Sequence, residues 1–396
     1  MNNKKIYKLF GYVSFSNLFF ERSIFVLYLA YKGLTISQIA IFQGIINIAM
    51  MIGEIPSGII ADQIGKKKAL MIGNVMMIFY YLCMLHSGKF LVAIFGAIIY
   101  GVGSTFITGT DEAYLYDLIT DREASVKYLG QLSAVITCSI GAAMFLGGYI
   151  QKIKWEMIIV LGVIAQIAGI IVLLFLPNIT YKANENKLTT VATFFISIKK
   201  NNFIQEIMIF LGINVGIVSA TYILAQDLFN QYGMSTEHIS MVFVVETALS
   251  VFVFSKIETI LKKIGKLRSL FISTIGTIIA FTCMNIHNIY IIAAMVLVIS
   301  LLNNYFSTVL MDEYNNQLED HVRATGISCF NMLSSLLMAF IFLLISKFES
   351  QYIIFLSAFG VISTVALIFT IKKFHKILEK KDLQKENGII GNSFFP

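Results

Sequence analysis

The sequence predicts an all-α membrane protein with twelve membrane-spanning helices, arranged as two pseudo-symmetric bundles of six. Three observations predict this fold: the composition, a series of long apolar segments, and a repeat between the two halves of the chain. Of the 396 residues, 57% are hydrophobic and only 13% are charged. Because soluble domains are about one-quarter charged, this composition indicates that lipid is the solvent.

A spanning helix needs about 20 predominantly apolar residues. Six such segments occupy the first half of the chain, at 7–31, 36–62, 69–87, 90–119, 128–151 and 155–177. Six more follow, at 203–231, 237–261, 269–286, 289–318, 324–347 and 351–373. They predict an N-terminal bundle over 1–177, a cytoplasmic central loop over 178–202, a C-terminal bundle over 203–373 and a tail over 374–396.

The first segment begins as a signal peptide does, with the basic stretch MNNKK before an apolar run. That run continues to about Tyr31 without a small-residue cleavage site, so we expect an uncleaved first span. In the second segment, Pro56 predicts a bend because proline removes a helical hydrogen bond. Connections between the segments are short, except for the polar central loop.

The distribution of Lys and Arg predicts the orientation. With the N-terminus in the cytoplasm, 23 of the 30 basic residues fall in inner segments, and the outer loops hold five, namely Lys32, Lys89, Lys152, Lys154 and Lys347. Cytoplasmic segments of membrane proteins are enriched in Lys and Arg. We therefore expect a multi-pass protein of the cell membrane with both termini in the cytoplasm. The same excess explains the net charge of +7 without nucleic acid as a partner.

The two halves repeat at an offset of 200 residues. Gly33 falls on Gly233, and the segment IGKKKAL, which starts at Ile64, falls on IGKLRSL, which starts at Ile264. At an offset of 201, Asp111 and Glu112 fall on Asp312 and Glu313. Several coincidences near one offset indicate two parallel halves of common design, which suit a carrier that rocks around a central site.

Other classes of protein are disfavoured. The four cysteines lie in apolar segments without the spacing of metal ligands or outer-loop disulfides, so we expect no metal and no cofactor. The sequence has no HExxH, GxSxG or Walker pattern, which argues against an enzyme. A non-transporting receptor is the remaining class, and it predicts no substrate flux in vesicles.

The segment GIIADQIGKKKAL, between the second and third spans, resembles the GxxxD[RK]xG[RK][RK] loop of the major facilitator superfamily. Gly58, Asp62, Gly65, Lys66 and Lys67 match the motif, and Gln63 replaces the usual basic residue. With the twelve spans and the second copy at Gly265, the resemblance covers nearly the whole chain. It implies a monomeric transporter in which this loop latches the two halves on the cytoplasmic side.

By the same resemblance, Asp117 corresponds to the acidic partner of Lys66 in that gate; the alternative is a solvated interfacial carboxylate. Arg323, in the segment VRATG, corresponds to a mirror latch in the second half, or else to a basic anchor at the membrane surface. The family also implies that the first, fourth, seventh and tenth spans line the cavity. Aromatic residues on those spans could stack on a substrate: Tyr12, Phe15, Tyr114, Tyr222 and Tyr305.

Ionisable residues inside a membrane mark a pathway or an ion pair. Away from their ends, the predicted spans contain eight acids, against Arg22 and Lys256 as bases; the acids are Glu21, Glu54, Asp111, Glu112, Asp227, Glu246, Asp312 and Glu313. We expect Glu21, Arg22, Glu54, Asp111, Glu112, Tyr114, Asp312 and Glu313 to form a substrate and proton cavity. Alternatively, Arg22 pairs with a neighbouring acid for structural reasons only.

This excess of acids favours a secondary transporter that exports amphipathic or cationic small molecules in exchange for protons. Uptake of a metabolite or sugar with protons is the alternative. Two features depart from drug–proton antiporters of the superfamily. Ala143 and Met144 replace the Gly-Pro of the fifth span, and Ala97 replaces an arginine of the fourth.

Overall fold

The computed structural model describes residues 2–119, 125–179, 202–318, 323–348 and 351–386, which form helices and turns with no strand among them. The N-terminal half comprises α1 (Asn2–Ser16), α2 (Phe25–Tyr31), α3 (Ile36–Ile64), α4 (Lys66–Leu85), α5 (Phe90–Ile107), α6 (Thr110–Leu118), α7 (Ser125–Ile150) and α8 (Trp155–Leu174). The C-terminal half comprises α10 (Asn202–Gln231), α11 (Thr236–Ile264), α12 (Lys266–Cys283), α13 (Ile289–Asn316), α14 (Arg323–Ile345) and α15 (Tyr352–Glu386).

The predicted fold class is confirmed. Among the described residues, 11 segments are long and apolar enough to cross a membrane. The predicted first span is present as well, but it consists of α1 and α2, each too short to cross alone. The limits of the two bundles stay predictions, and most of the central loop, 180–201, lies outside the described residues.

Two spans that we expected to be continuous are broken. The first is interrupted between Ser16 and Phe25, where the side chains of Ser16 and Asn17 both donate to the carbonyl of Val13 and so compete with the helical pattern. The fourth is interrupted at Gly109, whose φ of 78° is left-handed. Glycine adopts this conformation readily, so α5 ends and α6 starts in a new direction.

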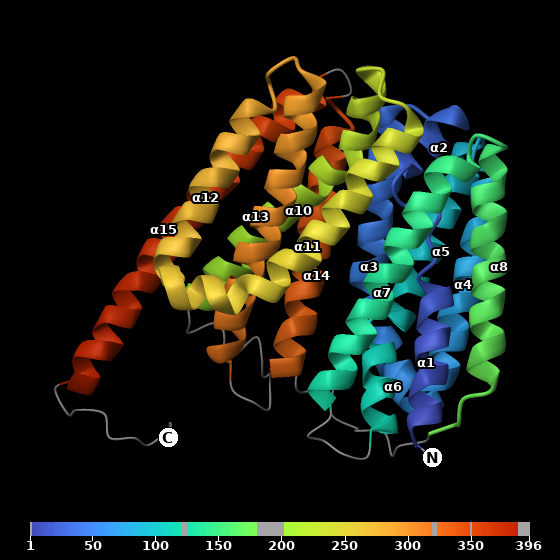
Figure 1. The fold of residues 1–396 in the computed structure, drawn as a ribbon, viewed down its shortest axis with the longest axis horizontal. Coiled ribbons are helices and arrows are strands. Elements are labelled where there is room, and N and C mark those ends of the chain that lie inside the picture. The colour runs from blue at the N-terminus through green and yellow to red at the C-terminus, as the bar shows by residue number, and fades with distance from the viewer. Residues whose placement is uncertain (1, 120–124, 180–201, 319–322, 349–350, 387–396) are drawn as a thin grey trace.

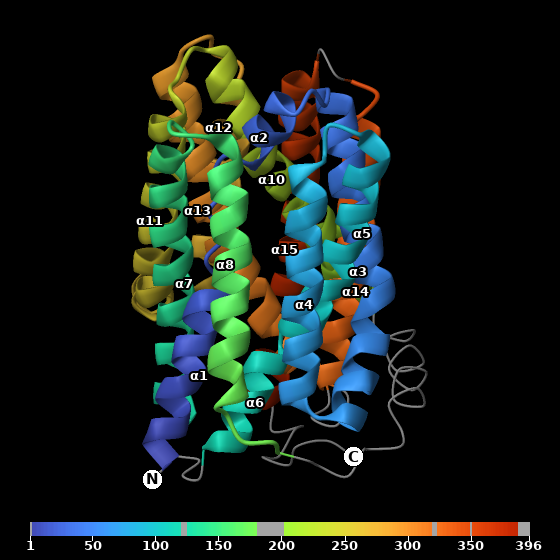
Figure 2. The ribbon, with the colours of Figure 1, turned by 90° about the vertical axis from the view of Figure 1, so that its right-hand side faces the viewer.

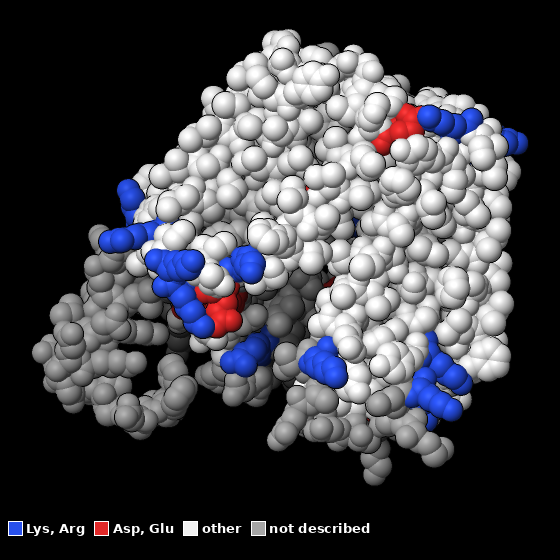
Figure 3. Space-filling model, viewed as in Figure 1, with Lys and Arg blue, Asp and Glu red and all other residues white. Residues whose placement is uncertain are grey.

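Figure 1 shows the two halves side by side, with α1 beginning and α15 ending toward the lower end. Figure 2 looks onto the N-terminal half, where α1, α8 and α4 stand next to one another and α6 lies near the lower end. We call the lower end the basic end, because Lys66 to Lys68 and Lys262 to Lys266 border it, and the upper end the opposite end. Most of the Lys and Arg visible in Figure 3 gather at the basic end.

The repeat is visible in the backbone. Gly65 and Gly265 have φ values of 92° and 85°, and each separates two helices at the basic end. Gly33 and Gly233, with φ values of 92° and 78°, turn the chain at the opposite end. Side chains other than glycine rarely adopt this conformation. The offset of 200 residues therefore relates matching turns in the two halves.

Hydrogen bonds and an ion pair join the halves at the opposite end. Ser23 and Ser240 lie 2.9 Å apart through their hydroxyl oxygens, and Lys152 of the N-terminal half forms an ion pair with Glu237. The hydroxyl of Ser37 donates to the carbonyl of Ser346 at 2.7 Å. Toward the basic end, the surface in Figure 3 is hollowed between the halves. The structure is therefore closed at the opposite end.

Candidate functional site

A cavity of about 540 Å³ lies between the two halves. Its walls come from the broken segment of the first span and from α2, α3, α4, α5, α7, α10, α11 and α13. Its aromatic side chains are Phe19, Phe25, Tyr80, Tyr100, Tyr222 and Phe254, and its uncharged polar side chains include Gln43, Thr137, Ser219, Gln226, Thr247, Ser250, Ser300, Asn303 and Asn304. The charged residues of the wall are Glu21, Arg22 and Glu246.

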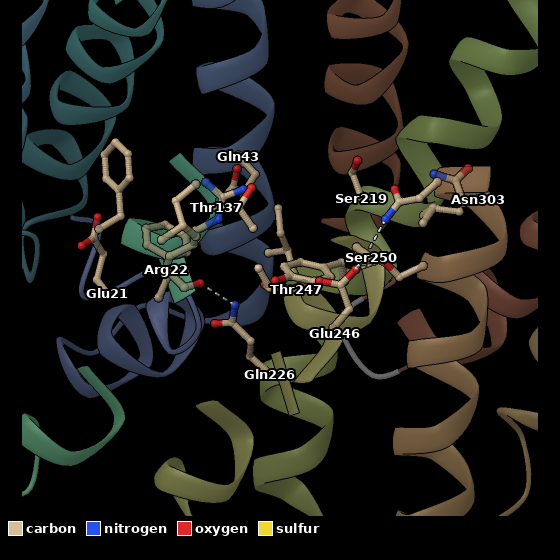
Figure 4. Close-up of a pocket in the computed structure, with 18 of the residues that line it drawn as sticks. Glu21, Arg22, Gln43, Thr137, Ser219, Gln226, Glu246, Thr247, Ser250 and Asn303 are labelled. Atoms are coloured by element: carbon tan, nitrogen blue, oxygen red, sulfur yellow. Dashed lines mark hydrogen bonds between the residues drawn. The ribbon is translucent and has the colours of Figure 1, made fainter. Parts of the chain in front are cut away.

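The break in the first span places Glu21 and Arg22 on different sides. Glu21 is 3% exposed, and the hydroxyl of Tyr81 lies 3.2 and 3.3 Å from its two carboxylate oxygens. Arg22 is exposed and extends toward Gln43, as Figure 4 shows. The two side chains therefore do not form a closed pair, although they lie within electrostatic range.

The side chain of Gln226 binds the broken span from the other half. Its Nε2 donates to the carbonyl of Arg22 at 3.0 Å, and its Oε1 accepts from the N–H of Val26 at 2.9 Å. Backbone groups inside a membrane need partners, because no water is available in the hydrocarbon region. Gln226 thus supplies, across the interface between the halves, partners for two groups at the break.

Glu246 is one of the eight acids named from the sequence, but it was left out of the expected cavity. It lies in α11, is 7% exposed and lines the cavity. Its Oε1 accepts hydrogen bonds from Ser250 at 2.9 Å and Ser300 at 2.5 Å. A signal was available: Ser250 follows one turn later on the same helix face, and Ser300, Asn303 and Asn304 form a polar group in an otherwise apolar span.

The acidic residues of the fourth span lie outside this cavity, near the basic end. Asp111 is 7% exposed in the first turn of α6, and its carboxylate accepts from the N–H of Glu112 at 2.9 Å. The side chain of Glu112 is exposed. Tyr114 is buried in the core of the N-terminal half and donates to the carbonyl of Pro177 at 2.5 Å. Of this span, only Tyr100, which precedes the turn at Gly109, lines the cavity.

The remaining predicted acids also lie away from the cavity wall. Glu54 is half-buried in α3 and lies close to Asn331 of α14. Glu313 is buried and its carboxylate contacts Lys266 at 2.7 Å, whereas the side chain of Asp312 is 66% exposed and 3.7 Å from Lys266. The structure thus brings together Glu21 and Arg22 in the cavity and assigns Glu313 to an ion pair at the basic end.

The residues of the motif between the second and third spans cluster at the basic end. Gly58 and Asp62 lie in the last turns of α3, and Gly65 separates α3 from α4. Lys66 contacts Asp117 at 2.7 Å as an ion pair and donates to the carbonyl of Ala113 at 3.0 Å. The predicted partnership between Lys66 and Asp117 is thus present within the N-terminal half.

Two further basic residues bind helix ends. Lys67 donates to the carbonyls of Leu174 and Leu176, at 3.0 and 2.6 Å, and so binds the end of α8, where carbonyls lack helical partners. Arg323, at the start of α14, donates from Nε to the carbonyl of Asn315 at 3.2 Å. Among the residues that the structure describes, no group of three His, Cys, Asp or Glu side chains could hold a metal ion.

A family model described as Major Facilitator Superfamily matches residues 11–343. Sugar transporter ERD6-like 6 of Arabidopsis thaliana is 24% identical over 63% of this chain and 57% of its own length. An uncharacterized MFS-type transporter of Methanocaldococcus jannaschii is 26% identical over 50% of this chain and 53% of its own length. The matches therefore span little more than half the length of these relatives.

Solved structures share the fold across nearly the whole chain. A mutant of the nucleoside transporter NupG has a TM-score of 0.82 at 13% identity, covering 93% of this chain and 100% of that one. A D-xylose-proton symporter has a TM-score of 0.66 at 12% identity, covering 91% and 94% of the two chains. At these identities the similarity concerns the fold.

Proposed function

Because this chain belongs to the Major Facilitator Superfamily, whose members are transporters and not enzymes, we propose that it carries a small polar molecule through the central cavity by alternating access. One observation carries the proposal. Charged and amide side chains of both halves meet around one shared space, and the halves touch one another at the opposite end. Separating those contacts while closing the basic end would expose the same space to the other side.

The cavity supports a polar cargo better than a lipophilic cation. The expectation of cationic compounds rested on the excess of eight acids over bases in the spans, and of those eight only Glu21 and Glu246 line the cavity. The wall itself combines one arginine, two glutamates and several amides and hydroxyls. The relatives and structures named as carriers of sugars, nucleosides and D-xylose also favour a polar metabolite as cargo.

We further propose that protons drive this transport and that Glu21 carries the coupling. Buried carboxylates in a transport pathway are the groups on which proton relays depend. Glu21 borders the cavity, is almost fully buried and has the Tyr81 hydroxyl as its partner. Export stays our prediction for the direction, with uptake as the alternative.

The test uses purified protein in vesicles with an enclosed pH-sensitive dye and labelled compounds, so that proton movement and compound flux are measured separately. A panel of sugars, nucleosides, amino acids and organic cations is offered under an imposed pH gradient, from the inside and from the outside. The proposal predicts substrate-dependent proton movement for a polar compound, and the side from which it moves gives the direction. Flux of every panel compound at the level of protein-free vesicles would contradict transport. Flux without proton movement would contradict the coupling.

A further inference from the structure

The two walls of the cavity carry opposite charges. Arg22 belongs to the N-terminal half and Glu246 to the C-terminal half, and Figure 4 shows them on opposite sides of the space, with Thr247 and Gln226 between them. A charge inside a membrane protein is costly unless it has a partner. The partners of these two residues therefore indicate what the cavity is built to hold.

The guanidinium of Arg22 is exposed to the cavity and forms no hydrogen bond or ion pair with the described part of the chain. Glu21, the adjacent residue and within electrostatic range, contacts the hydroxyl of Tyr81. The hydroxyls of Tyr100 and Tyr222 lie within its electrostatic range. A guanidinium presents donors in a planar fork that matches a carboxylate. Arg22 is thus an open site for an anionic group.

Glu246 is held in place by a short chain of hydrogen bonds. Asn304 donates from Nδ2 to the hydroxyl of Ser250 at 2.9 Å, so that hydroxyl directs its own proton to Oε1 of Glu246. Ser300 donates to the same oxygen. The second oxygen, Oε2, has no hydrogen bond within the described residues. The carboxylate is therefore fixed in orientation with one oxygen left for a ligand.

Resting on the transport function proposed above, we infer that the substrate is a small zwitterion, with its carboxylate on Arg22 and its ammonium group on Glu246. A simple cation would leave Arg22 without a partner, and a simple anion would leave Glu246 without one. A zwitterion satisfies both and links the two halves. The aromatic residues Tyr80, Tyr100, Tyr222 and Phe254 supply an apolar surface for the rest of the molecule.

The experiment measures the thermal stability of the purified full chain with the twenty L-amino acids and a set of dipeptides, beside sugars, nucleosides, carboxylic acids and organic cations. The most stabilising zwitterion is then compared with its carboxamide, which lacks the anionic group, and its N-acetyl derivative, which lacks the cationic one. We expect each derivative to bind about 10- to 100-fold more weakly than the parent, as for the loss of one charge-assisted hydrogen-bonded contact.

Two variants test which side chain binds the carboxylate and which binds the ammonium group of the zwitterion. Arg22→Gln should weaken binding of the zwitterion and remove its advantage over the carboxamide. Glu246→Gln should do the same relative to the N-acetyl derivative. Lys89→Gln and Glu258→Gln, which alter exposed residues outside the cavity, serve as matched controls and should bind as the unaltered protein does.

If no zwitterion stabilises the protein, the inference is wrong, whether or not a compound with a single charge or none does so. If both variants keep the preference of the unaltered protein for the zwitterion over its derivatives, the assignment of Arg22 and Glu246 is wrong. The outcome is separable from the transport proposal. If only a sugar or nucleoside moves in the vesicle assay, the transport proposal stands and the zwitterion inference is wrong. If a zwitterion binds but is never moved, the inference about binding stands and the transport proposal is wrong.

Discussion

Gln226 of one half donates its amide N–H to the carbonyl of Arg22 in the other half, at 3.0 Å. The same side chain accepts from the N–H of Val26, so one glutamine binds both backbone groups. Arg22, which lines the cavity, and the contacts that close the opposite end thus share one segment. Movement of the halves apart at this end must release both hydrogen bonds.

Replacing Gln226 with Leu should favour the state that is open at the opposite end. The variant leaves two buried backbone groups unpaired in the closed state, at about 1–3 kcal/mol for each group. A cysteine introduced at Ser23 should then react at least about tenfold faster with a membrane-impermeant maleimide applied from that side. Gln231→Leu, whose hydrogen bonds go to Asp227 and Tyr352 within the C-terminal half, is the control and should leave labelling unchanged.

Cysteines at positions 23 and 240 should lock the opposite end closed. The hydroxyl oxygens of Ser23 and Ser240 lie 2.9 Å apart, which brings thiols at these positions within reach of a disulfide. Oxidation should stop transport in vesicles, and a reductant should restore it. Either single cysteine should transport normally under both conditions. Full transport by the oxidised double variant, with the disulfide shown by mass spectrometry, would mean that this end does not open.

The ion pair between Lys266 and Glu313 at the basic end should stabilise the C-terminal half. At an offset of 200 residues, its two positions correspond to Lys66 and Ala113, which are joined in the N-terminal half. Lys66 donates to the backbone of Ala113 and pairs with Asp117, whereas Lys266, at the same offset, pairs with the side chain of Glu313. We expect Glu313→Gln to destabilise the protein by about 1 kcal/mol, because the pair is largely shielded from water. Exchange of the two charges, Lys266→Glu with Glu313→Lys, should restore part of the loss.

Thermal unfolding is measured for Glu313→Gln, for Lys266→Glu and Glu313→Lys separately, and for the double variant that exchanges the two charges. Asp312→Asn is the matched control, since that carboxylate is exposed and 3.7 Å from Lys266. A loss with Asp312→Asn equal to that with Glu313→Gln would show that general charge at this end matters and the specific pair does not.

The Glu21→Gln variant should separate proton coupling from substrate movement. We expect gradient-driven flux to fall to the level of protein-free vesicles, while exchange of labelled for unlabelled substrate continues. The reason is that the amide keeps the shape of the side chain beside Tyr81 but carries no titratable proton. The opposite result would be normal gradient-driven flux with Glu21→Gln and loss of that flux with Asp111→Asn. It would mean that the fourth span, and not Glu21, carries the proton coupling.

Sequence patterns were sufficient for the architecture because they depend on local properties. Apolar segments of spanning length, the basic excess at one end and the repeat of Gly65 at Gly265 are each visible along the chain. The partnership of Lys66 with Asp117 was also predictable, through the motif and its resemblance to a family. The first three features need only knowledge of the environment that a helix crosses or of the turn that a glycine allows, whereas the partnership needed the family resemblance.

The site required the tertiary structure. Sequence reasoning selected Asp111, Glu112, Asp312 and Glu313 from their position on expected cavity helices, but a left-handed turn at Gly109 and the pairing with Lys266 separate them from the cavity. It left Glu246 out of the expected cavity because nothing along α11 shows that Ser300 and Asn304 of another helix complete its hydrogen bonds.

What the sequence determined by itself was the solvent of this protein, the number of its spans and their twofold design, since burial in lipid constrains composition residue by residue. What only the tertiary structure decided was which charges share the central space. That choice depends on where two helices break and how the halves face each other, and both follow from packing between residues as far apart as Arg22 and Gln226.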